Sequence, residues 1–231
     1  MRLFFEIDIE ISKSLSEDES RHATKVLRLK NGDDVEVIDG KGNIFYCRIA
    51  NADSSACGVE IISQKKQYQK PYFLELVIAP TKNMDRVEWL VEKCVEIGVD
   101  SFVFIETKNS ERSKLRLDRL QKIAISAMKQ SKNYFMPSFS ELKKIEDVIN
   151  QDFKGQRFIA HCFENDKKHL KQLLKANSRY QILIGPEGDF TQQEIEKAIS
   201  KDFTPASLGE NRLRTETAAL LACAVVSITN A

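Results

Sequence analysis

Apolar residues recur with two different periods along this chain, and the period changes near residue 71. In the first part, short apolar stretches alternate with polar residues, which is the pattern of half-buried strands. Ser16 and Glu19 have the spacing of a capping box and predict a helix that ends near Leu27. Short strands around one helix predict a small β-barrel. The predicted strands of this part are residues 3–7, 34–38, 43–50 and 56–63.

Beyond residue 71, predicted strands and helices alternate. Residues 73–79 are apolar except for Glu75, a near-continuous run as expected of a strand that is buried on both faces. Apolar residues at helical spacing follow, and Gly98 is placed to end that helix. The alternation predicts an α/β domain with a largely parallel sheet, in which ligands bind beyond the carboxyl ends of the strands. Further strands are predicted at residues 101–105, 158–162, 181–184 and 206–208.

A polar stretch separates the two parts. Residues 64–70 are glutamine, lysine and one tyrosine, and Pro71 follows them. Such a run before a proline is typical of a short linker. We therefore predict two domains, residues 1–70 and residues 71–231.

The composition predicts an ordinary globular protein of the cytoplasm. Of the 231 residues, 42% are hydrophobic and 30% are charged. The first residues lack the apolar run of a signal peptide, and the longest apolar stretch, residues 218–226, is too short to span a bilayer. The five cysteines are widely spaced and form no CxxC pair, which argues against disulfides and against a zinc site. We expect no membrane segment and no metal.

The net charge of +1 does not by itself indicate a nucleic-acid partner. The charge is uneven, however, because residues 108–132 contain eight basic and two acidic residues. This stretch could contact a phosphate backbone, or it could be a solvated helix face. The sequence leaves both interpretations open.

Two segments at predicted strand ends carry the candidate chemistry. In residues 184–191 an apolar strand enters a loop with two glycines and a proline, and a helix follows at once. Gly185 and Gly188 allow a ligand to approach the backbone closely. Glu187 and Asp189 in the same loop disfavour a phosphate and favour a positively charged group or ribose hydroxyls. The alternative is a plain turn between strand and helix.

The second segment, residues 207–218, contains two arginines, two glutamates and three hydroxyl residues. It precedes an almost wholly apolar helix, which belongs in a core or an interface. Charged residues next to a buried helix must either form ion pairs or take part in binding or catalysis. A structural helix cap needs no pair of arginines such as Arg212 and Arg214, so a functional role is favoured.

These two segments resemble the signature of a known family. Ile-Gly-Pro-Glu-Gly-Asp-Phe at 184–190 and Ser-Leu-Gly-Glu-Asn-Arg-Leu-Arg-Thr-Glu-Thr-Ala at 207–218 are similar to motifs of the RsmE family. That family comprises bacterial methyltransferases of the SPOUT superfamily, which modify N3 of a uridine in 16S ribosomal RNA. The resemblance extends along the chain, to residues 1–5, 22, 25–33, 39–42, 82–99, 109–113, 130–131 and 137.

The resemblance implies a PUA-like RNA-binding barrel in residues 1–70 and a SPOUT domain with a C-terminal trefoil knot in residues 71–231. It implies a homodimer that holds S-adenosylmethionine in the knot and acts on 16S ribosomal RNA in the small ribosomal subunit. The chain departs from the family in three places. Gly188-Asp189 stands where the family often has Gly-Gly, and Asn211-Arg212 where it often has Arg-Ile. An arginine commonly follows Gln-Ser-Gly in the family, whereas Lys132-Asn133 follows Gln130-Ser131 here.

Site residues are expected from the resemblance, from the chemistry of N3 methylation and from charge. Arg214 is expected to donate hydrogen bonds to a uracil carbonyl oxygen, and Glu187 or Glu216 to orient groups or accept the N3 proton. Phosphate contacts are expected from Arg28, Lys30, Lys82, Arg86 and Arg112. The cofactor is expected to contact three strand-end loops through Cys162, Phe163, Ile184, Gly185, Pro186, Glu187, Gly188, Ser207, Leu208, Gly209, Asn211, Arg212, Leu213 and Thr215.

Two rival functions stay open from the sequence. One is a non-catalytic RNA-binding factor of ribosome assembly, which would have no affinity for the cofactor. The other is a SPOUT enzyme that methylates a ribose hydroxyl or a different base. The three histidines, His22, His161 and His169, do not fall at metal-ligand spacing.

Overall fold

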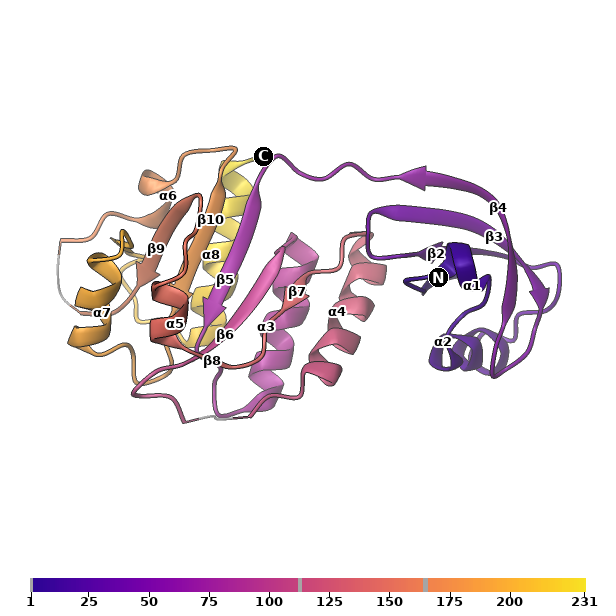
Figure 1. The fold of residues 1–231 in the computed structure, drawn as a ribbon, viewed down its shortest axis with the longest axis horizontal. Coiled ribbons are helices and arrows are strands. Elements are labelled where there is room, and N and C mark those ends of the chain that lie inside the picture. Colours follow the sequence, from indigo (N-terminus) through magenta and orange to yellow (C-terminus); the bar gives the residue numbers. More distant parts are fainter. Residues whose placement is uncertain (1, 112–113, 164–165) are drawn as a thin grey trace. The chain divides into compact units, whose positions relative to one another are not determined.

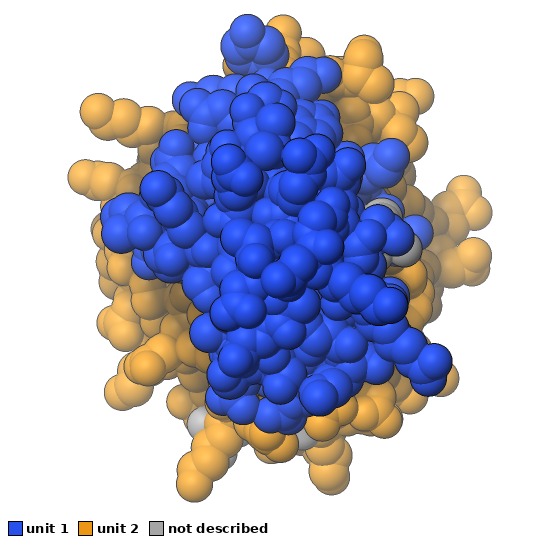
Figure 2. Space-filling model, turned by 90° about the vertical axis from the view of Figure 1, so that its right-hand side faces the viewer, with its two compact units in different colours: residues 1–69, 128–136 blue, residues 70–127, 137–231 orange. Residues whose placement is uncertain are grey.

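A computed structural model describes residues 2–111, 114–163 and 166–231. The chain divides into two compact units, which Figure 2 colours separately. Unit 1 is Met1–Gln69 with Met128–Met136, and unit 2 is Lys70–Ala127 with Pro137–Ala231. Helix α4 (Leu117–Ser131) begins in unit 2, and its last turn belongs to unit 1.

Unit 1 contains a four-stranded sheet in the order β1 (Leu3–Phe5), β2 (Asp34–Ile38), β3 (Asn43–Asn51), β4 (Gly58–Lys66). The pair β1·β2 is parallel and the other pairs are antiparallel. In this strand order, β1 and β4 form the edges of the sheet. Phe4, Val37 and Phe45 are fully buried in the core of this unit. The helical turns are α1 (Ile9–Ser12), α2 (Glu17–Arg21) and the π-helix η1 (His22–Val26).

Two local predictions for unit 1 were wrong. Ser16 occupies the N-cap position of α2, but its side chain makes no cap hydrogen bond. Glu19 instead accepts a hydrogen bond at 2.6 Å from Nζ of Lys129, in the last turn of α4. The predicted linker also starts too early, because β4 continues to Lys66 and the Gln67 amide donates to the Gly42 carbonyl at 2.7 Å.

Unit 2 is built on a parallel sheet, as the alternation of strands and helices predicted (Figure 1). The strands lie in the order β11-β9-β10-β5-β6-β7, with β8 also paired to β6, and every pair is parallel. Their bounds are β5 (Phe73–Ile78), β6 (Ser101–Glu106), β7 (Ser138–Phe139), β8 (Lys143–Lys144), β9 (Gln156–Ala160), β10 (Arg179–Ile184) and β11 (Thr204–Ala206).

Helices cover both faces of this sheet. Helix α8 (Thr215–Thr229) packs against α3 (Met84–Ile97) and against strands β5 and β10. On the opposite face, α5 (Ile145–Ile149) and α7 (Gln192–Ile199) share a core with alternate strand residues such as Val77, Ile159 and Leu183. Gly98 ends α3 as predicted, with φ +107° and its amide bonded to the Cys94 carbonyl. The short helix α6 (Leu170–Leu173) contacts α8.

The parallel arrangement brings the carboxyl ends of β6, β9, β10 and β11 to one edge of the sheet. The loops that follow these strands, residues 107–110, 161–163, 185–191 and 207–214, therefore gather at that edge. Both segments that the sequence analysis singled out are among them. None of the helices in the described part of the chain is long and apolar enough to cross a membrane.

Candidate functional site

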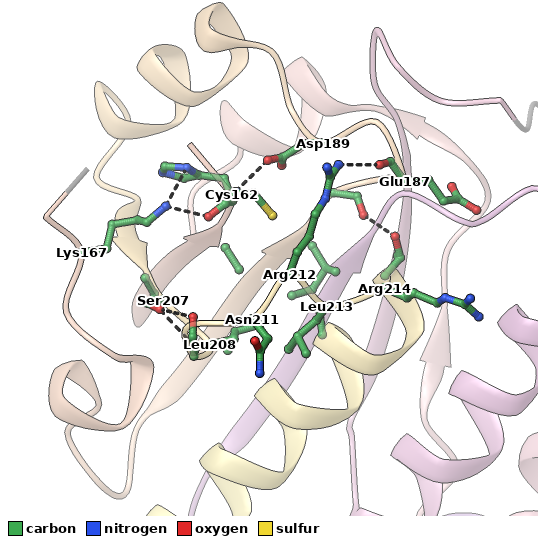
Figure 3. Close-up of a pocket in the computed structure, with 18 of the residues that line it drawn as sticks. Cys162, Lys167, Glu187, Asp189, Ser207, Leu208, Asn211, Arg212, Leu213 and Arg214 are labelled. Atoms are coloured by element: carbon green, nitrogen blue, oxygen red, sulfur yellow. Dashed lines mark hydrogen bonds between the residues drawn. The ribbon is translucent and has the colours of Figure 1, made fainter. Parts of the chain in front are cut away.

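A cleft of about 410 Å³ lies at this edge of the sheet (Figure 3). Its volume is in the range of small-molecule sites, roughly 300–1,000 Å³. It is walled by the loops after β9, β10 and β11. The lining residues are Ala160, His161, Cys162, Lys167, Ile184, Gly185, Pro186, Glu187, Asp189, Ala206, Ser207, Leu208, Gly209, Glu210, Asn211, Arg212, Leu213, Arg214, Thr215 and Ala218.

The loop after β10 is held rigidly at both ends. The predicted capping box is present, because Thr191 Oγ1 accepts from the Glu194 amide and the Glu194 carboxylate accepts from the Thr191 amide. Phe190 is buried beneath the loop, and a Cβ on Gly185 would come within 3.1 Å of its ring. A larger residue at position 185 would crowd the Phe190 ring, so this close packing shapes one wall of the cleft.

The last loop is tied to the loop after β10. Arg212 Nη2 donates to the Glu187 carbonyl at 3.2 Å, and Thr215 Oγ1 donates to the Gly185 carbonyl at 2.9 Å (Figure 3). Gly209 has φ +133°, a conformation that side-chain-bearing residues rarely adopt. The two loops therefore form one continuous wall.

The loop after β9 closes the other side of the cleft. Lys167 Nζ donates to the carbonyls of His161 and Phe163, at 2.7 and 2.6 Å, and lies 3.2 Å from His161 Nδ1. Burial lowers the pKa of His161, and the charge of Lys167 lowers it further, so the ring is neutral at pH 7. Because Nδ1 accepts from an ammonium group, the ring proton is on Nε2. That buried nitrogen has no hydrogen-bond partner among the described residues.

Most of the cofactor residues expected from the sequence lie along this cleft. Phe163 and Gly188 do not line it. The carbonyl of Phe163 holds Lys167, and the carbonyl of Gly188 accepts from Asn109. The other twelve residues of that set, Cys162, Ile184, Gly185, Pro186, Glu187, Ser207, Leu208, Gly209, Asn211, Arg212, Leu213 and Thr215, all line it.

The three expected catalytic residues are not all in one place. Arg214, the N-cap residue of α8, and Glu187 line the cleft, and in Figure 3 their side chains extend to the same side, away from Cys162 and Ser207. Glu216 does not line the cleft. It is buried, its Oε1 lies 3.7 Å from Arg86 Nε, and its Oε2 has no hydrogen-bond partner among the described residues.

Several cleft residues were missed by the sequence reasoning. Ala160 and Ala206 end β9 and β11, so their places follow once the strand ends are known exactly. Lys167 gave no signal, because it reaches the cleft only through its long side chain. The remaining missed residues are His161, Glu210 and Ala218. Asp189 also lines the cleft; the sequence predicted that its charge suits a positive group or ribose hydroxyls, but did not place it among the cofactor contacts.

The expected RNA-contacting residues are spread over both units. Arg28 and Lys30 line a second cleft of about 560 Å³ in unit 1, together with Lys25. In unit 2, Lys82 forms an ion pair with Glu111 at 3.0 Å, and Arg86 is next to Glu216 as described above. Arg112 lies outside the described residues. Within the described ranges, histidine, cysteine, aspartate and glutamate form no group of three that could hold a metal ion.

Comparison with known proteins places this chain in a family. A family model described as an RNA methyltransferase domain matches residues 68–227, and one described as an RNA methyltransferase PUA domain matches residues 15–62. The ribosomal RNA small subunit methyltransferase E of Rickettsia conorii is 30% identical over 93% of this chain and 88% of its own length.

Solved structures agree with these matches. The probable rRNA-methyltransferase from Porphyromonas gingivalis has a TM-score of 0.93 and 42% identity, covering 100% of this chain and 98% of that one. The ribosomal RNA small subunit methyltransferase E of Neisseria gonorrhoeae, solved with S-adenosylmethionine bound, has a TM-score of 0.86 and 26% identity, with coverages of 100% and 98%. The RsmE resemblance seen in the sequence is confirmed: the chain belongs to the RNA methyltransferase family that includes ribosomal RNA small subunit methyltransferase E.

Proposed function

We propose that this protein transfers the methyl group of S-adenosylmethionine to N3 of a uridine in 16S ribosomal RNA of the small subunit. The observation that carries the proposal is the cleft itself. Its walls are the two segments that resemble the family signature, residues 184–190 and 207–218, and the chain brings them together by direct hydrogen bonds.

The residues of the cleft suit this cofactor. Ile184, Leu208 and Leu213 offer apolar surface to an adenine ring, and the exposed Glu187 suits ribose hydroxyls and a positive charge. When bound, S-adenosylmethionine supplies a methyl group on a positively charged sulfur.

The chain's own residues then have to activate the nucleophile. Uridine N3 is a poor nucleophile while it carries a proton. Loss of that proton places negative charge on the two neighbouring carbonyl oxygens. Arg214 donates hydrogen bonds to one of these oxygens. Glu187, exposed on the same side as Arg214, orients the base or accepts the proton. Glu216, which is buried beside Arg86 and does not line the cleft, is the alternative candidate for this role.

We further propose that the last segment is threaded as a trefoil knot. Ser207 pairs with the backbone of residues 168–170, through 3.0 and 2.8 Å hydrogen bonds, while Arg212 and Thr215 bond to the loop after β10. These contacts support a path in which the last loop crosses between the earlier ones.

The substrate RNA contacts the basic residues of both units in this proposal. Unit 1 is the PUA-like domain, and its Arg28 and Lys30 line an open cleft that suits a phosphate backbone. Lys82, Arg86 and Arg112 are the proposed contacts from unit 2.

A second copy of the chain completes the active enzyme. Helix α8 is apolar over most of its surface, with Ile228 68% exposed, and Trp89 on the neighbouring helix α3 is 41% exposed. A surface of this kind suits a partner helix pair rather than water. We place the enzyme in the cytoplasm, where its five free cysteines remain reduced.

The proposal is tested by two measurements on the pure protein. Titration with S-adenosylhomocysteine in a calorimeter is expected to show saturable binding. Incubation of S-adenosylmethionine with small ribosomal subunits, followed by mass spectrometry of the nucleosides, is expected to yield 3-methyluridine from 16S RNA and none from large-subunit RNA. Absence of cofactor binding with and without RNA would support the assembly factor. A different methylated nucleoside would support another SPOUT activity.

The Cys162 thiol provides an independent test of the cleft. Cys162 is exposed and lines the cleft, whereas Cys47, Cys57, Cys94 and Cys223 are buried. Partial burial of its thiol at the cleft wall raises the pKa of Cys162, and Asp189 raises it further, so its thiolate forms only in alkaline solution. The pKa of Cys47 is raised to about 11 by burial.

Iodoacetamide is therefore expected to label one thiol, Cys162, with a rate that still rises above pH 9. Mass spectrometry locates the adduct, and saturating S-adenosylhomocysteine is expected to slow its formation. First labelling at a buried cysteine, or no protection by the ligand, contradicts the proposed site.

A further inference from the structure

Asp189 is the residue at which three strand-end loops meet. Its carboxylate Oδ2 accepts from the Cys162 amide at 2.7 Å, in the loop after β9 (Figure 3). Its own carbonyl accepts from Asn109 Nδ2 at 2.9 Å, in the loop after β6. Strand β5 lies between β6 and β10 in the sheet, so the contact from Asn109 reaches across one strand. Residue 189 itself belongs to the loop after β10.

The backbone at Asp189 is in the left-handed region, with φ +60°. Glycine adopts this conformation freely, and aspartate tolerates it better than most residues. The turn is fixed by the Asp189 amide, which donates to the Pro186 carbonyl at 2.9 Å. Asp189 Oδ1 accepts from the following amide, that of Phe190, at 2.8 Å. The carboxylate therefore has a defined orientation, with one oxygen for its own loop and the other for the loop after β9.

The loop after β6 is anchored in turn. The Lys108 amide donates to Glu194 Oε1 at 2.9 Å, in the first turn of α7. Asn109 Nδ2 also donates to the Gly188 carbonyl at 3.1 Å, and a Cβ on Gly188 would come within 3.1 Å of Asn109 Cβ. Asn109 thus fits closely against the outside of the cleft wall without lining the cleft.

We propose that Asp189 is a positioning residue of the cofactor cleft, which fixes the loops after β9 and β10 at the separation where both contact one ligand. This inference rests on the proposed function, because it takes S-adenosylmethionine to be that ligand. In this chain the carboxylate adds a link between the two walls that glycine cannot supply.

The central test compares Asp189→Gly with the wild-type protein. Glycine keeps the positive φ without strain and removes only the carboxylate. A charge-assisted hydrogen bond of this kind is expected to be worth about a ten- to one-hundred-fold change in the dissociation constant for S-adenosylhomocysteine. Asp189→Asn retains one acceptor oxygen and is expected to recover part of the loss. The matched control is Asp202→Gly, because exposed Asp202 has φ +65° and does not line the cleft.

If Asp189 positions the two loops, two further results are expected, one for ligand affinity and one for steady-state kinetics. Asn109→Ala is expected to weaken the same binding several-fold, although Asn109 does not line the cleft. In steady-state methylation, Asp189→Gly is expected to raise KM for S-adenosylmethionine while kcat at saturating cofactor and RNA changes less than about two-fold. A general loss of structure would lower kcat and the melting temperature together.

The outcomes separate this inference from the proposed function. If the wild-type protein binds no S-adenosylhomocysteine, with or without RNA, the proposed function fails. If the wild type binds and Asp189→Gly binds equally well, the positioning role is wrong and the function stands. If Asp189→Gly loses affinity but Asn109→Ala does not, Asp189 contacts the ligand directly and the three-loop link is rejected. If Asp189→Gly does not fold, the affinity of Asp189→Asn for S-adenosylhomocysteine is compared with the wild type and with Asn109→Ala in the same way.

Discussion

Replacement of Gly209 by valine is expected to weaken binding of S-adenosylhomocysteine by roughly one hundred-fold. Gly209 has φ +133°, and an added Cβ would meet no atom within 4 Å. The obstacle is therefore backbone strain, which is severe for a β-branched residue, and not collision. Relief of the strain would break the turn in which Ser207 Oγ bonds to both the amide and the carbonyl of Gly209, at 3.1 Å each. Isothermal titration calorimetry measures the effect.

Gly32→Val is the matched control for this experiment. Gly32 also has a positive φ, +91°, with no atom within 4 Å of an added Cβ, and it lies in unit 1. Both variants therefore carry a similar backbone strain, and only one of them carries it in the cleft. Equal affinity of Gly209→Val and the wild type would show that the last loop does not hold the cofactor.

Replacement of Arg214 by alanine is expected to slow single-turnover methylation by about 10²–10³-fold at saturating RNA and cofactor. The reason is the loss of a donor aimed at the carbonyl oxygen on which charge develops. Affinity for S-adenosylhomocysteine is expected to change little, because the Arg214 side chain extends away from Cys162 and Ser207 (Figure 3). Arg214→Lys keeps the positive charge but loses the planar pair of donors. Its methylation rate is expected to lie between those of the wild type and Arg214→Ala.

Arg21→Ala provides the comparison for this second prediction. Arg21 is an exposed arginine in unit 1, paired with Glu17 at 2.7 Å, and its removal should leave the methylation rate unchanged. Full single-turnover activity of Arg214→Ala would exclude the proposed role. The same single-turnover measurement on Glu187→Gln and Glu216→Gln would identify the proton acceptor. Only the loss of the acceptor should slow methylation about as much as Arg214→Ala does.

The elements of unit 2 could be predicted because their signals are local. The apolar run of β5 and the glycine that ends α3 depend on a few neighbouring residues, as does the capping box of Thr191 and Glu194. The interactions behind each of these patterns lie within one helical turn or one strand. The parallel sheet followed from their order along the chain.

The errors in unit 1 have the opposite cause. Glu19 was assigned to a cap from its spacing to Ser16, but it pairs with Lys129, which is 110 residues away. The polar residues taken as a linker continue β4, and Gln67 Oε1 accepts from the Tyr134 amide at 2.9 Å. A long-range partner overrode a local preference in both cases, and no local pattern contains such a partner.

The sequence by itself determined the family, the parallel architecture and most of the cleft wall. These features are encoded in short segments, residues 184–190 and 207–218, whose residue types are restricted by backbone conformation and by charge. Only the tertiary structure decided which distant groups meet there. Lys167 folds back to hold the loop after β9, Glu216 turns to Arg86, and Asn109 reaches Asp189 across a strand. Contacts of this kind depend on strand order and on the reach of side chains, and both are properties of the folded chain.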